Sequence, residues 1–189
     1  MADSRDPWAD VKTRHGFPAD EVISALQKEI RRGEAENAAL LAYEMATTSP
    51  ELEAFLWRRL LIISVEDIGF GDIQAPVLMY NLHQICQVLG RGAGERLLME
   101  IHAVRYLCAQ KKDRSSDEMV MWMKRKVEGG DVLPAIPDYA IDLHTRRGQA
   151  IGRDLSHFIS EAAKIHPELP DRDTTYRDRM LEILGHPTK

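Results

Sequence analysis

The sequence is poor in aromatic residues and in cysteine, and it contains no long apolar run. Aromatic residues make up 6% of the 189 positions, and the two cysteines are Cys86 and Cys108. Both cysteines fall in apolar stretches, which is typical of small core residues in a reducing compartment and excludes a disulfide framework. The longest apolar run, Leu60 to Val65 with one serine inside it, is far shorter than the ~20 residues of a membrane-spanning helix.

The sequence also lacks an excess of positive charge and an apolar leader segment. Its 25 basic and 30 acidic residues give a net charge of −5. This balance excludes a protein that coats DNA with its whole surface, so any binding of phosphates has to come from a local patch. Because the first residues show no apolar core of a secretory signal, we expect a cytoplasmic protein with no membrane partner.

Motifs of nucleotide-dependent and zinc-dependent enzymes are missing too. The sequence has no Gly-x-x-x-x-Gly-Lys-Ser/Thr loop, no His-Glu-x-x-His and no Cys-x-x-Cys. The glycine-rich stretch at 90–94 lacks both the Lys-Ser/Thr pair and a preceding strand, so we interpret it as a turn between helices. We therefore predict no cofactor, no metal and no catalytic residue.

Helical periodicity is the main positive signal. Apolar residues recur three and four positions apart through most of the chain, and no pair of strands is evident, so we predict an all-α fold. The spacing predicts helices over residues 22–32, 34–47, 50–68, 72–89, 95–110 and 115–128, followed by two short helices over 154–165 and 174–184. The helix over 50–68 is apolar most of the way round, which indicates a central position in a compact bundle.

The organisation along the chain divides into three parts. We expect a flexible lead-in over residues 1–18, a helical domain over 19–128, and a loop plus helical tail over 129–189 that packs on the same domain. The tail begins with an irregular loop near 129–153, where prolines and glycines interrupt the periodicity. Ser115 and Glu118 have the spacing of a capping box, and Val120 is expected to be the buried aliphatic residue of the helix that follows.

Two adjacent acids, Glu66 and Asp67, stand near the end of an apolar helix, where negative charge is disfavoured. Because neighbouring helical residues point about 100° apart, the two acids do not form a facing acid–base pair. We predict an ion-pair hub that joins helices, with a site for a partner or ligand as the open alternative. The residues assigned to this interaction or structural hub are Arg58, Arg59, Glu66, Asp67 and His144.

Basic residues gather locally in two stretches, although the whole chain is acidic. Such islands can follow phosphate groups, or they can be ordinary solvated surface. The candidate nucleic-acid-binding residues are Lys111, Lys112, Arg114, Arg146, Arg147 and Arg153.

Two further patterns keep alternatives open. Asp142 and His144 could belong to an enzyme of unrecognised type, or they could be part of a polar loop in which Asp142 and Thr145 cap the local backbone. The methionines at 119, 121 and 123 are typical of core filling, and an adaptable docking face is the other interpretation.

A family resemblance runs through the middle of the chain. It rests on residues 25–33 with 38–40, on Arg58-Arg59-Leu60 leading into Ser64-Val65-Glu66-Asp67-Ile68-Gly69, and on residues 105–112. These stretches resemble the C-terminal region of the MgsA/RarA AAA+ ATPases, the replication-associated recombination protein A family, over roughly residues 22–125. Residues 130–189 lie outside the resemblance, and the loop at 142–148 is interpreted as a specialisation.

The resemblance implies a helical domain related to the clamp-loader collar, which forms homotetramers and serves replication-fork maintenance. It implies no ATP turnover for these residues, because the ATPase portion of the family is absent from them. We therefore favour a non-catalytic oligomerisation and interaction domain, with replication or repair proteins, including a separate ATPase, as partners. A DNA-binding module that uses the basic residues is the alternative, and an enzyme around Asp142 and His144 is the third.

Overall fold

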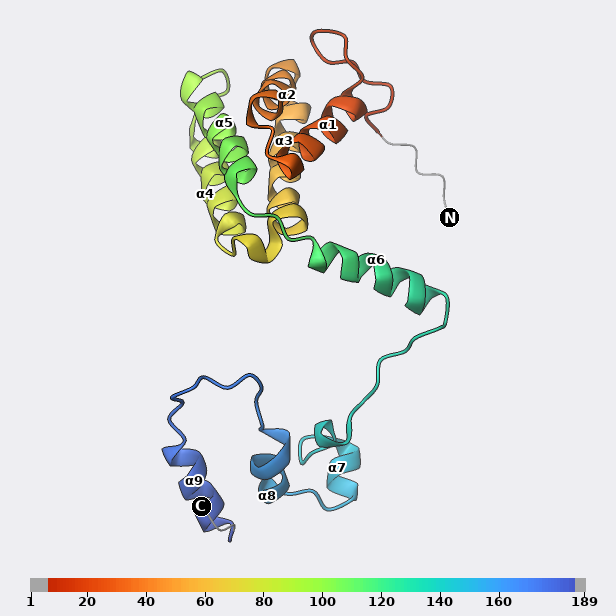
Figure 1. Cartoon of the computed structure of the whole chain (residues 1–189), viewed down its shortest axis with the longest axis vertical. Helices are drawn as coiled ribbons and strands as arrows, with labels where there is room; N and C mark the ends of the chain where they lie inside the picture. Colours follow the sequence, from red (N-terminus) through yellow and green to blue (C-terminus); the bar gives the residue numbers. More distant parts are fainter. Residues whose placement is uncertain (1–6, 186–189) are drawn as a thin grey trace. The chain divides into compact units, whose positions relative to one another are not determined.

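The computed structural model describes residues 7–185, which contain helices, turns and one isolated bridge between Lys12 and Pro18 in place of a sheet. The predicted all-α class is confirmed. The chain divides into two compact units, residues 1–129 and 130–189 (Figure 1). This division falls where the helical periodicity of the sequence fades. The packing of the tail on the helical domain stays a prediction. None of the described helices is long and apolar enough to cross a membrane.

The first unit is a helical bundle from which one further helix extends (Figure 1). Helices α1, α2, α3 and α5 pack on one another, and α4 packs on α3 and α5. The elements of this unit are α1 (Ala19–Arg32), α2 (Ala35–Thr48), α3 (Pro50–Ile63), the π-helical turn η1 (Ser64–Ile68), the 3₁₀ turn η2 (Gly69–Gly71), α4 (Ala75–Val88), α5 (Gly94–Ala109) and α6 (Ser115–Glu128).

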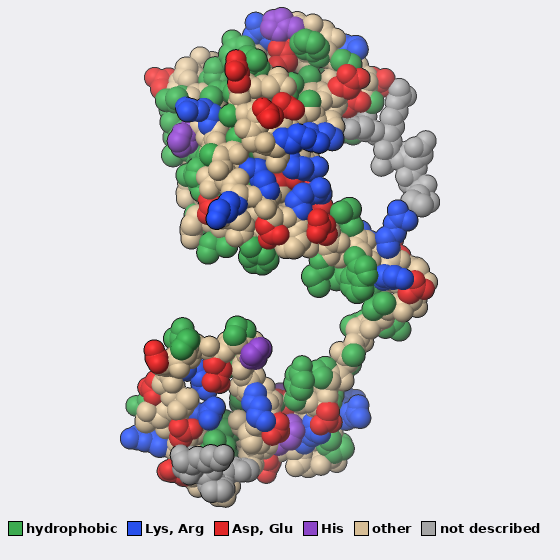
Figure 2. Space-filling view, in the orientation of Figure 1, with side chains coloured by type: hydrophobic (Ala, Val, Ile, Leu, Met, Phe, Trp, Pro, Cys, Tyr) green, Lys and Arg blue, Asp and Glu red, His purple; other side chains and the backbone are tan. Residues whose placement is uncertain are grey.

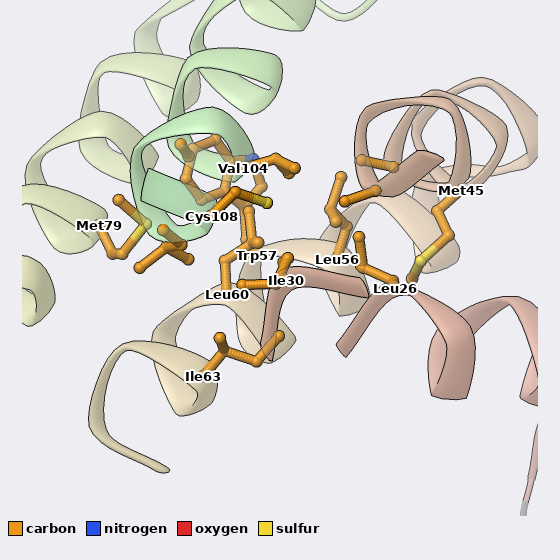
Figure 3. Packing of buried hydrophobic residues seen from close by; sticks show 14 of the residues in the cluster. Leu26, Ile30, Met45, Leu56, Trp57, Leu60, Ile63, Met79, Val104 and Cys108 are labelled. Carbon is orange, nitrogen blue, oxygen red and sulfur yellow. The ribbon is translucent and has the colours of Figure 1, made fainter. Parts of the chain in front are cut away.

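Helix α3 supplies much of the core, as its apolar sequence predicts. Trp57, Leu60 and Ile63 are completely buried (Figure 3). The Trp57 ring stacks on the His83 ring at a centroid distance of 5.2 Å. The opposite side of α3 departs from the prediction, because Ile62 remains 38% exposed. The helix is therefore central on one face, and its last turn borders solvent on the other.

Both cysteines lie in the core, in agreement with their apolar sequence context. Cys86 on α4 and Cys108 on α5 are buried and carry free thiols. Burial raises the pKa of each thiol to about 11. Both groups are thus protonated thiols near neutral pH.

Helix α6 has the predicted bounds, and it differs from the prediction in its N-terminal cap and in its burial. Ser115 is the first helical residue rather than the cap, and its backbone N–H donates to Asp113 Oδ1 at 3.0 Å. The capping box is therefore wrong. Val120 is 42% exposed, and no residue of α6 is buried, so the expectation of a buried aliphatic residue is wrong as well.

The described part of the expected flexible lead-in is an ordered turn. The Thr13 N–H donates to the Phe17 carbonyl at 2.9 Å, and the Arg14 N–H donates to Thr48 Oγ1 at 3.1 Å. His15 Nδ1 lies 2.6 Å from Glu44 Oε2 on α2. Residues 8–18 are therefore fastened to α2 by polar contacts that the sequence pattern does not reveal. Residues 1–6 lie outside the described residues.

The second unit consists of short helical pieces in an irregular chain. Its elements are the 3₁₀ turn η3 (Asp138–Ala140), α7 (Arg146–Ala150), α8 (Leu155–His157), the π-helical turn η4 (Phe158–Ala162) and α9 (Thr175–Ile183). The two predicted terminal helices correspond to 155–162 and 175–183. The buried apolar residues of the described chain all belong to the first unit, so polar contacts have a large share in fixing the second.

Candidate functional site

Glu66 and Asp67 form an ion-pair cluster with residues of other helices, which we call the 66–67 cluster. Asp67 is completely buried, and its carboxylate accepts a hydrogen bond from Arg31 Nε of α1. This hydrogen bond and the negative charge raise the pKa of Arg31. Gln27 Nε2 donates to Glu66 Oε1 at 2.7 Å and to Asp67 Oδ2 at 2.9 Å, so one amide bridges both acids.

Arg114 extends the 66–67 cluster to the start of α6. Its Nε atom lies 3.5 Å from Asp67 Oδ1, its Nη2 atom lies 3.9 Å from Glu66 Oε1, and the same guanidinium pairs with Asp117. The Asp113 backbone N–H also donates to the Asp67 carbonyl at 3.0 Å. These contacts fasten the segment that leads into α6 to η1, the turn that follows α3.

The glycines after the acids permit this close approach. A Cβ atom on Gly69 would lie 2.4 Å from the Asp113 carbonyl oxygen, and one on Gly71 would lie 2.3 Å from the Lys111 carbonyl oxygen. Gly69 also has a φ of +51°, which side chains disfavour. The Glu66-Asp67-Ile68-Gly69 stretch is thus a docking place for residues 111–114.

The other residues assigned to the hub have different surroundings. Arg59 reaches the cluster indirectly, because it donates to Gln27 Oε1. The prediction that Arg58 belongs to the hub is corrected. Its guanidinium lies over the Phe55 ring, 5.7 Å from the ring centroid, and not at the two acids. His144 belongs to the second unit, where its Nδ1 atom lies 2.9 Å from Asp142 Oδ2.

Three of the six candidate nucleic-acid-binding residues have structural partners within the chain. Lys112 Nζ donates to the carbonyls of Leu107, Cys108 and Gln110 at 2.9, 3.0 and 2.5 Å, where α5 ends. Burial lowers the pKa of this ammonium group. Arg114 is part of the 66–67 cluster. Arg153 donates to the Ile141 carbonyl at 2.6 Å and to Asp138 Oδ2 at 2.5 Å.

The remaining three, Lys111, Arg146 and Arg147, are exposed. Lys111 lies between α5 and α6, whereas Arg146 and Arg147 open α7 in the second unit. The six candidate basic residues therefore divide into three that are exposed and three whose side chains bind partners within the chain.

Asp142 and Thr145 organise the loop that leads into α7. Asp142 Oδ1 accepts the His144 N–H at 3.0 Å, and Thr145 Oγ1 accepts the Gly148 N–H at 2.9 Å. The hydrogen bond from the His144 ring lowers the pKa of Asp142. A Cβ atom on Gly148 would lie 1.8 Å from the Asp142 carbonyl oxygen. Asp142 and Thr145 thus cap the local backbone, which is one of the two interpretations that the sequence allows for this loop. Residues 7–185 hold no group of three potential metal ligands.

A second buried polar group escaped the sequence analysis. Glu53 of α3 lies 3.1 Å from Arg91 Nε and also pairs with Arg96, which donates to the Cys86 carbonyl at 2.5 Å. Glu100 of α5 is only 2% exposed, and burial together with the charge of Glu53 raises its pKa to about 8. The one available signal was an acid on the apolar face of the predicted helix over 95–110.

Helix α6 carries an exposed apolar surface. Figure 2 shows hydrophobic side chains along this helix, six of which are between 37% and 58% exposed: Met119, Val120, Met121, Trp122, Met123 and Val127. A groove of about 450 Å³ lies beside them, lined by Leu61, Ile62, Val65 and Val120, with the acids Glu66 and Asp117 at its rim and Ser116 completing the lining. We call this helix and groove the α6 surface.

Comparisons with known proteins agree with the resemblance and lengthen it. A family model described as the C-terminal region of MgsA AAA+ ATPases matches residues 33–165. The match covers Glu66, Asp67 and Arg114 of the 66–67 cluster and the whole of α6, and it also includes the loop at 142–148. The expectation that the resemblance ends before residue 130 is therefore wrong.

Relatives named replication-associated recombination protein A match about 70% of the chain. The protein from Bacillus subtilis (strain 168) is 31% identical over 137 residues, which are 72% of this chain and 31% of that protein. Those from Haemophilus influenzae (strain Rd) and Escherichia coli (strain K12) are 29% and 31% identical over 67% of this chain and 26% of each relative. The chain thus spans roughly a quarter to a third of the length of these relatives.

Proposed function

Since the chain belongs to the family of MgsA AAA+ ATPase C-terminal regions, we propose that it is a non-catalytic helical domain that oligomerises and binds proteins of DNA replication and recombination repair. The role in replication and recombination follows the name of its relatives, replication-associated recombination protein A. We further propose that an AAA+ ATPase is among its partners and performs the ATP-dependent work, because the family model that the chain matches is described as the C-terminal region of AAA+ ATPases.

The observation that carries the proposal is the α6 surface. Soluble proteins rarely leave a contiguous patch of large apolar side chains in water unless a partner covers it. Helix α6 has no buried residue, yet five of its fourteen positions carry methionine, valine or tryptophan at more than 40% exposure. Methionine-rich surfaces adapt readily to a bound protein, which favours docking over core filling.

The experiment is a measurement of molar mass in solution by light scattering on the whole chain. We expect a multiple of 21.5 kDa, and the resemblance suggests a tetramer. Val120→Asp with Met123→Asp should lower the mass to that of the monomer, because charges would be buried in the assembled state. The control is Leu98→Asp on α5, at a side chain that is 61% exposed and outside the α6 surface. A mass of 21.5 kDa for the wild-type chain at micromolar concentration would refute the proposal.

DNA binding is a second candidate function, supported by the exposure of Arg146 and Arg147 at the start of α7. We expect fluorescence anisotropy with forked and single-stranded DNA to show an affinity that falls steeply with salt. Replacing both arginines with alanine should weaken binding about equally for all sequences and flatten the salt dependence. The control is Arg179→Ala, at an exposed arginine of α9. Unchanged binding in the double variant would exclude this site.

A further inference from the structure

We propose that two copies of the chain pair through α6 in an antiparallel arrangement, with α6 of each copy lying along α6 of the other. This inference rests on the proposed function, since it names the partner and its orientation at the α6 surface. Three features of α6 support this arrangement: the spacing of its side chains on one face, the order of its charges and its attachment to the bundle.

One face of α6 carries a stripe of three apolar residues and the small polar residue Ser116, and these four positions are symmetric about the centre of the helix. Ser116, Val120, Met123 and Val127 are separated by four, three and four positions, which places them on one face of the helix. This spacing reads the same from either end, with its midpoint between residues 121 and 122. In an antiparallel pair Val120 therefore lies opposite Met123 of the second copy, and Ser116 lies opposite Val127. A two-fold axis through the midpoint satisfies the requirement that each copy uses the same patch.

The order of charges along α6 selects the antiparallel orientation. Glu118 and Asp117, the latter also paired with Arg114, precede the centre of the stripe. Three bases and one acid follow it: Lys124, Arg125, Lys126 and Glu128. In a parallel pair equal residues lie at equal height, so acids would face acids and bases would face bases. In the antiparallel pair the acidic half of one helix faces the basic half of the other at both ends. Opposite charges at the flanks of an apolar seam set partner orientation in helix pairs.

The attachment of α6 to the bundle makes this surface available in a fixed direction. Arg114 joins Glu66, Asp67 and Asp117, so the first turn of α6 is held to η1. Ile62 and Val65, which are 38% and 52% exposed, continue the apolar surface beyond the stripe and give the second copy more area to cover. A helix held in place before association loses less conformational freedom when it binds.

Disulfide cross-linking tests the orientation in the whole chain. Two variants are made, Ser116→Cys and Val127→Cys, and each is oxidised alone and mixed with the other. The wild-type chain is the control, since Cys86 and Cys108 are buried. Residues 116 and 127 are about 16 Å apart along a helix axis, whereas a disulfide needs Cα atoms within about 7 Å. We expect cross-linked dimers in the mixture and monomers in either variant alone.

The outcomes separate the orientation from the assembly itself. Cross-linking of either variant with itself would overturn the antiparallel arrangement and indicate a parallel pair. A chain that is oligomeric by light scattering but gives no cross-link in the mixture would show that assembly uses another surface, and it would overturn this inference alone. A monomeric wild-type chain would overturn the proposed oligomerisation as well.

Discussion

The buried carboxyl group of Glu100 makes the stability of the first unit depend on pH in a direction that can be derived. Burial and the neighbouring Glu53 raise the pKa of Glu100 from 4.5 to about 8 in the folded chain. Between these two values the folded chain keeps a proton that the unfolded chain releases. The unfolded state then binds fewer protons, so the free energy of unfolding falls as the pH rises from about 4.5 to about 8.

The magnitude follows from the size of the shift. One pKa unit corresponds to about 1.4 kcal/mol, so the shift of Glu100 sets an upper limit of about 5 kcal/mol on the stability lost across this pH range. Glu100→Gln removes the titrating group and keeps its shape and polarity. Below pH 5 we expect the wild-type chain and the variant to be similar in stability, and near pH 8 we expect the variant to be the more stable.

The assay is denaturant unfolding followed by circular dichroism at half-unit pH steps between pH 4.5 and 8.5. Because other groups titrate in the same range, the measured quantity is the difference between wild type and variant at each pH. Glu95→Gln is the matched control, since Glu95 lies on the same helix and is exposed. A difference between wild type and Glu100→Gln that does not change with pH would refute the reasoning.

Two further predictions concern the attachment of α6. Asp67→Asn should lower the free energy of unfolding by about 2 kcal/mol in urea titrations, because a buried carboxylate that pairs with two arginines loses its charge. Glu66→Gln, at a partly exposed acid, should lower it by less than about 1 kcal/mol. Equal effects of the two substitutions would contradict the central role of Asp67 in the 66–67 cluster. Gly69→Ala should cost at least about 2 kcal/mol, since its Cβ would collide with the Asp113 carbonyl at a positive φ. Gly16→Ala shares the positive φ without a neighbour within 4 Å and should cost only about 1 kcal/mol, so a similar loss in both would refute the role of the close approach.

The helices and the ends of most of them could be predicted, because they depend on local pattern. Gly33 ends α1 in the left-handed conformation that glycine adopts easily. Helix α6 ends at Glu128, immediately before Gly129, as the sequence predicts. The capping box failed for a non-local reason. Asp113 already accepts the Ser115 N–H and the Phe70 N–H, so the residue that satisfies the start of α6 comes before the predicted motif.

The roles of the charged residues could be predicted only in part, because partners distant in sequence decide them. The position of Glu66 and Asp67 on an apolar helix predicts cations from elsewhere, but not that Arg31 and Arg114 supply them. Lys112 sits among basic residues that are typical of a surface patch, yet its ammonium group binds carbonyls where α5 ends. Composition counts charges and does not show which backbone groups lack hydrogen-bond partners.

Residues 66–69, which carry the clearest family resemblance, are structurally connected to the α6 surface, which is proposed for assembly. Glu66 and Asp67 bind Arg114, and Gly69 leaves room for the backbone at Asp113, so the turns η1 and η2 that follow α3 fix where α6 begins. Without this attachment α6 would be an isolated amphipathic helix of fourteen residues, which is marginally stable in water. Besides stabilising the bundle, the 66–67 cluster holds the first turn of α6 in place. The exposed apolar side chains of this helix are therefore in a fixed position before a partner covers them.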